Sequence, residues 1–146
     1  GAATTSVNLA GRDLFSGLTV AQEAGRQAYE MAGVSAADID VAEVHDCFTI
    51  AEMMAYEDLG FAAPGEGKEL IKRKETYKEG RIPVNVDGGL LSKGHPIGAT
   101  GGSQIRTIVL QLRNEAGDIQ VDNPQIGLVH NIGGVGLYGN VTILGR

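Results

Sequence analysis

The sequence constrains its fold most tightly at residues 92–102, SKGHPIGATGG. His95 stands between Gly94 and Pro96, so the backbone itself, rather than packing inside a strand or helix, restricts its position. Small residues and glycines follow, and the apolar spacing after them predicts a helix over about residues 100–114. The pattern places His95 at a loop tip just before a helix, where its side chain is available to a group outside the core.

The sequence on either side alternates predicted helices and strands. Helices are predicted over residues 18–33, from Asp46 or Thr49 to about Leu59, and over 100–114. Strands are predicted at 41–45, 125–132 and 138–144, with a weak one at 82–86. Helices between strands require crossover connections, so we expect a largely parallel sheet whose last strand returns antiparallel.

Side-chain spacing gives each predicted helix a start, a stop or a buried face. Thr19 and Gln22 form a capping-box pattern at the start of the first helix, and Gly33 is expected to end it. The residues predicted to share one face are Ile50, Met53 and Met54 in the second helix, and Ile105, Ile108, Val109 and Leu112, facing inward, in the third.

Length and composition exclude several classes of function. A chain of 146 residues is long enough for one domain, and its net charge of -6 argues against nonspecific nucleic-acid binding. No apolar run approaches the roughly 20 residues that a membrane-spanning helix needs. The single cysteine excludes an intrachain disulfide and a zinc cage, and a lone thiol fits a reducing cytoplasm.

Two glycine-rich stretches resemble nucleotide-binding signatures but fail on context. Residues 134–139, GVGLYG, match the dinucleotide pattern, yet the residues that follow predict a strand and leave no room for the phosphate-binding helix. Residues 88–94, GGLLSKG, put the lysine before the second glycine, so the phosphate-loop pattern fails too. Neither stretch predicts a nucleotide site.

All three histidines and the only cysteine stand at boundaries between predicted elements: His45, Cys47, His95 and His130. In a parallel sheet such junctions gather at the carboxyl edge, where ligands bind in these folds. Cys47 is predicted to lie in or near the first turn of a helix, where the helix dipole would lower its pKa. The alternative is that Cys47 is an inert buried thiol.

A basic run offers a second candidate surface. It comprises Lys68, Lys72, Arg73, Lys74, Lys78 and Arg81, with three glutamates interleaved and a fourth just before it. The run would suit a phosphate of coenzyme A or an acidic partner, whereas interleaved charges are more often solvated surface.

The chain resembles the C-terminal half of a thiolase, on four stretches that occur in the family's order. They are AQEAGRQAYEMAGVSAADIDVAEVHDCF (21–48), NVDGGLLSKGHPIGATGG (85–102), QLRNEAG (111–117) and GLVHNIGGVG (127–136). HDCF stands where many thiolases carry NEAF, and Asn131 where most carry a cysteine. Both departures are typical of the sterol-carrier-protein-x type and of archaeal and bacterial acetyl-CoA acetyltransferases.

The resemblance implies an α/β fold: a three-layer α/β/α half with a mixed five-stranded sheet. Residues 1–146 would form the C-terminal domain, with the first strand truncated and the N-terminal half absent. The implied reaction is a Claisen condensation, or thiolytic cleavage of a 3-ketoacyl-CoA, through an acyl-cysteine on that other half. Coenzyme A thioesters are the substrates, with no tightly bound cofactor and no metal.

The resemblance also implies roles for individual residues. His95 takes the proton of the nucleophilic thiol, and Cys47 serves as the second acid/base in place of the family's usual cysteine. His45 and His95 donate to one oxyanion, and the N–H of Gly133 helps to form a second oxyanion hole. His130 and Asn131 are expected to be pocket walls.

The implied partners are the N-terminal thiolase half, in the same chain or a separate subunit, and further copies in an oligomer. An OB-fold protein and a hydroxymethylglutaryl-CoA synthase accompany related archaeal enzymes. The chain alone is expected to be inactive. Two alternatives are a thiolase-fold aldolase or lyase acting on a coenzyme A ester, and a non-catalytic scaffold subunit.

Overall fold

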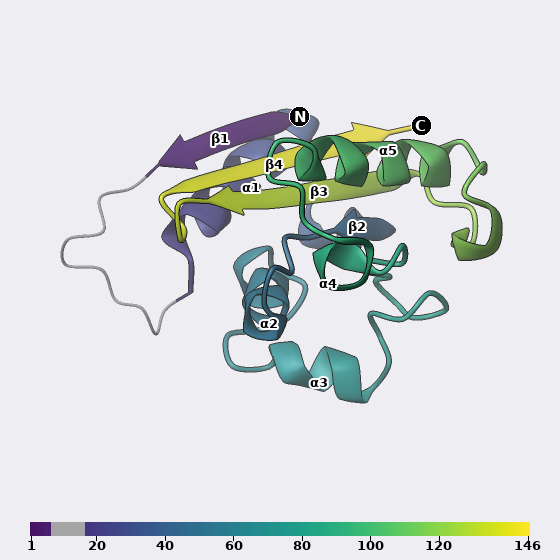
Figure 1. Cartoon of the computed structure of the whole chain (residues 1–146), viewed down its shortest axis with the longest axis horizontal. Coiled ribbons are helices and arrows are strands. Elements are labelled where there is room, and N and C mark those ends of the chain that lie inside the picture. Colours follow the sequence, from purple (N-terminus) through teal and green to yellow (C-terminus); the bar gives the residue numbers. More distant parts are fainter. Residues whose placement is uncertain (7–16) are drawn as a thin grey trace.

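Within residues 1–6 and 17–146, the part of the chain that the computed structural model describes, four strands form one mixed sheet (Figure 1). The strands are β1 (Ala2–Ser6), β2 (Val41–Glu43), β3 (Ile126–Gly133) and β4 (Tyr138–Gly145), in the spatial order β1-β4-β3-β2. β4 pairs antiparallel with both β1 and β3, and β2 pairs parallel with β3. The predicted antiparallel return of the last strand is confirmed.

Two details of the predicted sheet are wrong. Only the β2–β3 pair is parallel among the strands of the described residues, so the sheet is mixed and not largely parallel. The fifth strand, expected at residues 82–86, is reduced to a single bridge between Val84 and Ala42. Pro83 has no N–H to donate, and Asn85 takes a left-handed conformation with φ 51°, so the pairing cannot extend in either direction.

The predicted three-layer α/β/α architecture is confirmed. Helix α1 (Thr19–Ala32) covers one face of the sheet over β1 and β4, and α5 (Thr100–Leu112) covers the other over β3 and β2 (Figure 1). The remaining helices are α2 (Thr49–Asp58), α3 (Gly67–Lys72), α4 (Gly89–Lys93) and the short 3-10 turns Ala36–Asp38 and Gly117–Ile119. As expected, residues 134–139 run from a turn into β4 and not into a helix.

Two hydrophobic cores lie on opposite faces of the sheet because successive residues of a strand point to opposite sides. Ala42 and Leu128 belong to the core under α1 and α2, whereas Val41 and Val129 belong to the core under α5. By the same alternation, Glu43 at the end of β2 points to the α5 side. This places a carboxyl group in the buried layer between the sheet and α5.

Several predicted helix details are changed by tertiary contacts. The capping box at Thr19 does not form; instead the Asp58 carboxylate from α2 accepts hydrogen bonds from Leu18 N–H (2.9 Å) and from the Gln22 side chain (2.8 Å). Gly33 ends α1 in a left-handed conformation, as predicted. Ile105 is 40% exposed, and Gln104 lies inward in its place.

Candidate active site

The end of β2 leads directly into the segment His45–Asp46–Cys47, and α2 begins two residues later at Thr49. His45 and His95, fifty positions apart in the sequence, meet with their ring centroids 4.9 Å apart and their planes at 85°. The loop before α5 therefore brings the predicted loop-tip histidine against the strand end.

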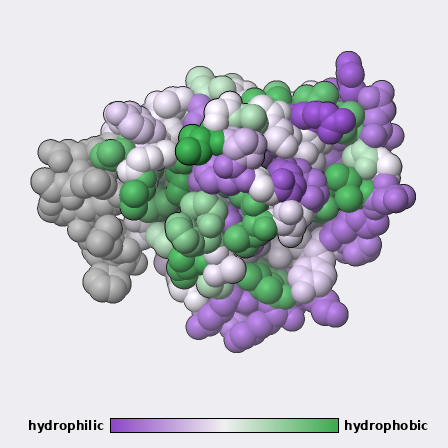
Figure 2. Space-filling model, in the orientation of Figure 1, coloured by the Kyte–Doolittle hydropathy of each residue, from purple (hydrophilic) through white to green (hydrophobic). Residues whose placement is uncertain are grey.

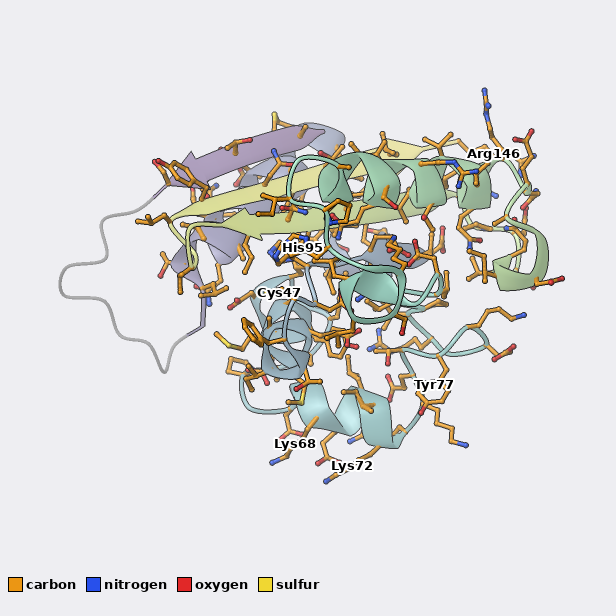
Figure 3. All side chains as sticks on the ribbon, viewed as in Figure 1. Cys47, Lys68, Lys72, Tyr77, His95 and Arg146 are labelled. Atoms are coloured by element: carbon orange, nitrogen blue, oxygen red, sulfur yellow. The ribbon has the colours of Figure 1, made fainter. Side chains whose placement is uncertain are left out.

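A cavity of about 510 Å³ opens in front of the two histidines. Five of the predicted site residues line it: His45, Cys47, His95, Asn131 and Gly133. Figure 3 shows Cys47 and His95 close to each other beside the start of α2. The rest of the wall is almost entirely apolar and includes Leu18, Phe48, Ile50, Met54, Ile97 and Val135.

His130 does not line this cavity, which departs from its predicted place in the wall. It is fully buried, and among the described residues neither of its ring nitrogens has a hydrogen-bond partner. Burial, reinforced by the nearby His45, lowers the pKa of His130 to about 3. His130 is therefore a neutral imidazole behind the site at neutral pH.

His45 is also held neutral. Burial of the ring and the proximity of His95 lower the pKa of His45, and the Asp46 carboxylate and the Asn131 side chain oppose this only in part. Asn131 is fixed in turn, because its amide donates to Oε1 of the buried Gln104 at 2.8 Å. Gln104 also donates to the carbonyl of His130 at 3.3 Å, so one α5 side chain ties both β3 residues together.

The orientation of His95 follows from Thr100, the first residue of α5. Thr100 Oγ1 donates to the Pro96 carbonyl at 3.1 Å and lies 2.7 Å from His95 Nδ1. With its hydrogen engaged in this way, the hydroxyl accepts from Nδ1–H, and the lone pair of Nε2 is left to accept a proton. Thr100 was not singled out in the sequence, where it is one of several small residues after the histidine.

The predicted low pKa of Cys47 is wrong. Cys47 lies two residues before α2, near its first turn as expected. Burial and the neighbouring Asp46 carboxylate raise the pKa of the thiol, and the backbone N–H groups of Cys47 and Phe48 only partly offset this. Cys47 is therefore a protonated thiol in the described structure at neutral pH.

Asp46 holds the two parts of the site together, and sequence reasoning missed it. Its buried carboxylate accepts from the N–H of Leu90 at 2.7 Å and from that of Leu91 at 3.4 Å. It thereby caps α4, the helix just before His95, from the segment that carries His45 and Cys47. The signal available in the sequence was its position inside HDCF, between the predicted site residues His45 and Cys47.

Apolar side chains stay exposed around the mouth of the cavity. Val135 is 93% exposed, Ile97 89% and Phe48 70%. Figure 2 shows hydrophobic side chains gathered over α2 and hydrophilic ones over α3 beside it. The site is thus set in an apolar surface.

Comparison with known proteins identifies the family. A family model described as "Thiolase C-terminal domain-like" matches residues 1–146. The chain belongs to the thiolase family. It is 50% identical over 123 residues to an acetyl-CoA acetyltransferase of Methanothermobacter thermautotrophicus, which is 84% of this chain and 32% of that protein.

Other relatives of this thiolase domain carry different names. It is 44% identical over 117 residues to human sterol carrier protein 2, covering 80% of this chain and 21% of that protein. The solved structure of a protein named "Ltp2-ChsH2(DUF35) aldolase" superposes with a TM-score of 0.89 at 29% identity, over 100% of this chain and 38% of the other. The thiolase domain therefore spans no more than about a third of these two curated relatives.

The basic run of the thiolase domain lies apart from the site, and several of its charges form ion pairs with glutamates of the same segment. Glu69 pairs with Lys72 at 2.8 Å, and Glu75 with Arg81 at 2.8 Å and Arg73 at 3.6 Å. Lys74 lies over the ring of Tyr77. Figure 3 shows Lys68 and Lys72 projecting from α3, away from Cys47 and His95.

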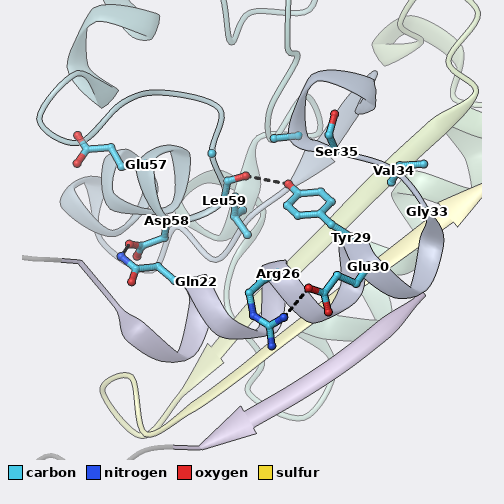
Figure 4. A pocket seen from close by; sticks show the side chains of 12 residues that line it. Gln22, Arg26, Tyr29, Glu30, Gly33, Val34, Ser35, Glu57, Asp58 and Leu59 are labelled. Atoms are coloured by element: carbon cyan, nitrogen blue, oxygen red, sulfur yellow. Dashed lines mark hydrogen bonds and ion pairs between the residues drawn. The ribbon is translucent and has the colours of Figure 1, made fainter.

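A second cavity of the thiolase domain, of about 530 Å³, lies between α1 and α2 (Figure 4). Arg26 on its rim pairs with Glu30 at 2.6 Å, and the Tyr29 hydroxyl donates to the Leu59 carbonyl at 2.8 Å. None of the predicted site residues lines it.

Over residues 1–6 and 17–146, no helix of the thiolase domain combines the length and apolarity that crossing a membrane requires.

Gly89 of the thiolase domain tests the Asp46 contact. Its φ is 61°, and a Cβ there would overlap the Asp46 carboxylate. We expect Gly89→Ala to lower the free energy of unfolding by about 1–3 kcal/mol through strain and the displaced cap. It should also speed hydrogen exchange at the amides of Leu90 and Leu91, and urea unfolding with amide exchange measures both effects.

The matched control is Gly101→Ala within α5, where an added Cβ meets nothing within 4 Å. Alanine is the better helix former, so this variant should gain about 0.5–1 kcal/mol. If Gly89→Ala were as stable as the parent protein and exchanged its amide hydrogens at the parent rate, the capping of α4 by the Asp46 carboxylate would be refuted.

Proposed function

We propose that this chain is the C-terminal catalytic half of a thiolase that joins or cleaves acyl units carried on coenzyme A. The observation that carries the proposal is the position of His95, whose Nε2 is left free by the Thr100 contact, at an apolar cavity that Cys47 and His45 also line. A base and a thiol facing one apolar pocket suit covalent acyl transfer followed by carbanion chemistry.

In the first half-reaction, a cysteine of the N-terminal half attacks the thioester carbonyl of an acyl-CoA. His95 Nε2 accepts the thiol proton as the new carbon–sulfur bond forms, and the bond to coenzyme A breaks. The protonated imidazole then returns that proton to the departing coenzyme A thiolate. The product is an acyl-cysteine with no net change in oxidation state.

In the second half-reaction, Cys47 as thiolate removes the α-proton of a second acyl-CoA. The resulting carbanion attacks the acyl-cysteine carbonyl and releases the nucleophilic cysteine as a thiolate, which regains its proton from the Cys47 thiol. His45 and His95 donate to the enolate oxygen, for which the Thr100 hydroxyl turns to support the Nε2–H form of His95. The N–H of Gly133 belongs to the second oxyanion hole, and Asn131 orients His45.

The raised pKa of Cys47 bears on which direction of the reaction, thiolysis or condensation, the resting enzyme is ready for. A resting thiol is ready to donate its proton to the carbanion that leaves in thiolysis, whereas condensation requires prior loss of that proton. Its thiolate, once formed, is a stronger base than an ordinary cysteine thiolate, which suits proton removal from carbon.

The reaction requires a companion half, and further partners are part of the proposal. We propose an oligomer, an OB-fold partner and a cytoplasmic setting, with a hydroxymethylglutaryl-CoA synthase as a neighbour. Support for a partner protein comes from the similar solved structure, whose name joins Ltp2 with ChsH2(DUF35).

The aldolase alternative rests on the name of that same solved structure, and one experiment separates the two reactions. The complete protein, with its N-terminal half, is incubated with acetoacetyl-CoA with and without free coenzyme A. A thiolase cleaves acetoacetyl-CoA once to give acetyl-CoA and an acetyl-enzyme detectable by mass spectrometry, and it turns over repeatedly only when free coenzyme A is present. Release of an aldehyde or ketone from a β-hydroxyacyl-CoA, with no acyl-enzyme, would show an aldolase, and no turnover on either substrate would favour a scaffold.

A further inference from the structure

A buried carboxyl group outside the proposed reaction lies directly under the loop that carries His95. Glu43, the last residue of β2, has no exposed side-chain surface. Neither of its oxygens accepts a hydrogen bond from the described residues, and Asp87 lies close enough for the two carboxyl groups to share a proton. A glutamate in this state requires a compensating group, because an ionised carboxylate is very costly to bury.

The charged groups around Glu43 do not supply enough positive charge. Lys93 Nζ lies 3.6 Å from Glu43 Oε2 and forms an ion pair with Asp87. The Asp46 carboxylate also acts on Glu43. The cluster therefore holds one ammonium and three carboxyl groups, so its net charge is closest to zero when Glu43 holds a proton.

The ionised Asp87 carboxylate is the acceptor for the proton of Glu43. Asp87 accepts from the Thr107 hydroxyl at 2.6 Å and from Gly89 N–H at 2.9 Å, and it stays ionised: the hydrogen bonds from Lys93, Thr107 and Gly89 and the Lys93 charge outweigh burial and lower the pKa of Asp87. Burial, followed by the charge of Asp87, raises the pKa of Glu43 to about 9. The neutral acid beside the ionised one can donate to it.

This cluster fixes both ends of α4. Asp87 bonds to the first residue of the helix and to its last residue, Lys93, which precedes His95 by two positions. Asp46 also accepts from the N-terminal end of the same helix. The backbone that leads into His95 is therefore anchored on β2, α5 and the segment before α2.

We infer that Glu43 is a positioning residue for His95: as a neutral carboxylic acid it donates to Asp87 and, with Lys93, holds the loop at residues 87–95 in place. The inference rests on the proposed function only for its effect on catalysis. The protonation of Glu43 and the order of the loop are properties of the fold.

The pH dependence has a definite sign. The folded protein keeps a proton that an unfolded glutamate, with a pKa of about 4.3, releases. The free energy of unfolding therefore falls as pH rises from that value to about 9, where Glu43 ionises in place. Above that pH the cluster gains a negative charge, and the loop should loosen.

Three variants of the complete enzyme test the inference: Glu43→Gln, Glu43→Ala and the control Glu57→Gln, whose carboxylate accepts from Gly67 N–H far from this loop. Glutamine keeps the shape and a donor toward Asp87, so Glu43→Gln should acylate near the parent rate at neutral pH. In the parent, the acylation rate should decline as Glu43 ionises at about pH 9, and Glu43→Gln should lose this decline. Glu43→Ala should acylate about 10- to 100-fold more slowly, since small misplacements cost that much.

Two readouts do not require activity. The infrared band of a neutral carboxylic acid should be present at neutral pH in the parent and in Glu57→Gln, and absent from Glu43→Gln. Amide exchange at residues 88–95 should be faster in Glu43→Ala alone. If the parent proves inactive as a thiolase, these two measurements still decide the inference.

Three results would overturn it. The first is absence of the infrared band in the parent, which would mean that Glu43 is ionised. The second is a Glu43→Gln variant as impaired as Glu43→Ala. The third is parent-like acylation and exchange in Glu43→Ala. Should Glu43→Ala fail to fold, the infrared band and the pH profile of Glu43→Gln remain decisive.

Discussion

Replacing His95 with alanine should reduce acylation of the complete enzyme by a factor of about 10²–10⁴, the usual worth of a general base. The nucleophilic thiol then has no acceptor for its proton at the position of Nε2. The fold should be nearly unaffected, because His95 is exposed on its loop and contributes little burial. Rapid quenching with acetyl-CoA, followed by mass spectrometry of the acyl-enzyme, measures the rate directly.

Two companion experiments separate loss of the base from loss of structure. Lys72→Ala removes an exposed side chain on α3 and should acylate at the parent rate. Free imidazole, added to His95→Ala, should restore part of the acylation rate by entering the space left by the ring. Undiminished acyl-enzyme formation in His95→Ala would refute the role given to this residue.

Replacing Cys47 with alanine should divide the two half-reactions. Acylation from acetyl-CoA should continue at close to the parent rate, while condensation falls about 10²–10⁴-fold, because the carbanion can no longer be formed by proton transfer to the thiolate. Cys47→Ser should lose condensation too, since a hydroxyl is a far weaker acid than a thiol. Acyl-enzyme mass and acetoacetyl-CoA formation, followed in the same samples, report the two steps.

The pH profile gives a further check on Cys47. The raised pKa means that the thiolate fraction grows as pH increases through and above neutrality, so parental condensation should rise over that range. Met54→Leu, which changes another sulfur-containing side chain of the cavity wall without a titrating group, should keep this profile. Equal loss of both half-reactions in Cys47→Ala would contradict the division of labour.

The sequence was sufficient for the layers of the fold and for two of the segments that meet at the candidate site. Apolar spacing and the glycine at position 33 located α1, and the motifs HDCF and GHP marked two segments that meet in space. A fifth strand was predicted at residues 82–86 because their side chains are typical of strands. The sequence does not reveal that the backbone of Asn85 is left-handed. Local pattern fixes elements well where backbone conformation is ordinary.

What the sequence could not indicate depends on contacts between distant segments. Gln104 and Glu43 look like surface residues in their local patterns, and only tertiary packing buries them. The pKa of Cys47 was predicted in the wrong direction because it depends on burial of the thiol and on the adjacent Asp46 carboxylate. Buried polar groups are the part of a site that local pattern predicts worst.

The hydrogen bond between Asp46 and the N–H of Leu90 joins residues that are 44 positions apart. The intervening chain, with α2 and α3, thus leaves the site at Asp46 and returns to it at Leu90, after Val84 has bridged to Ala42 of β2. Lengthening a loop costs little entropy, about 0.6 kcal/mol for each doubling. The turn around the exposed Glu79 is therefore the place where evolution or an engineer can insert a new segment, such as an affinity tag or a binding module, while the chemistry stays where it is.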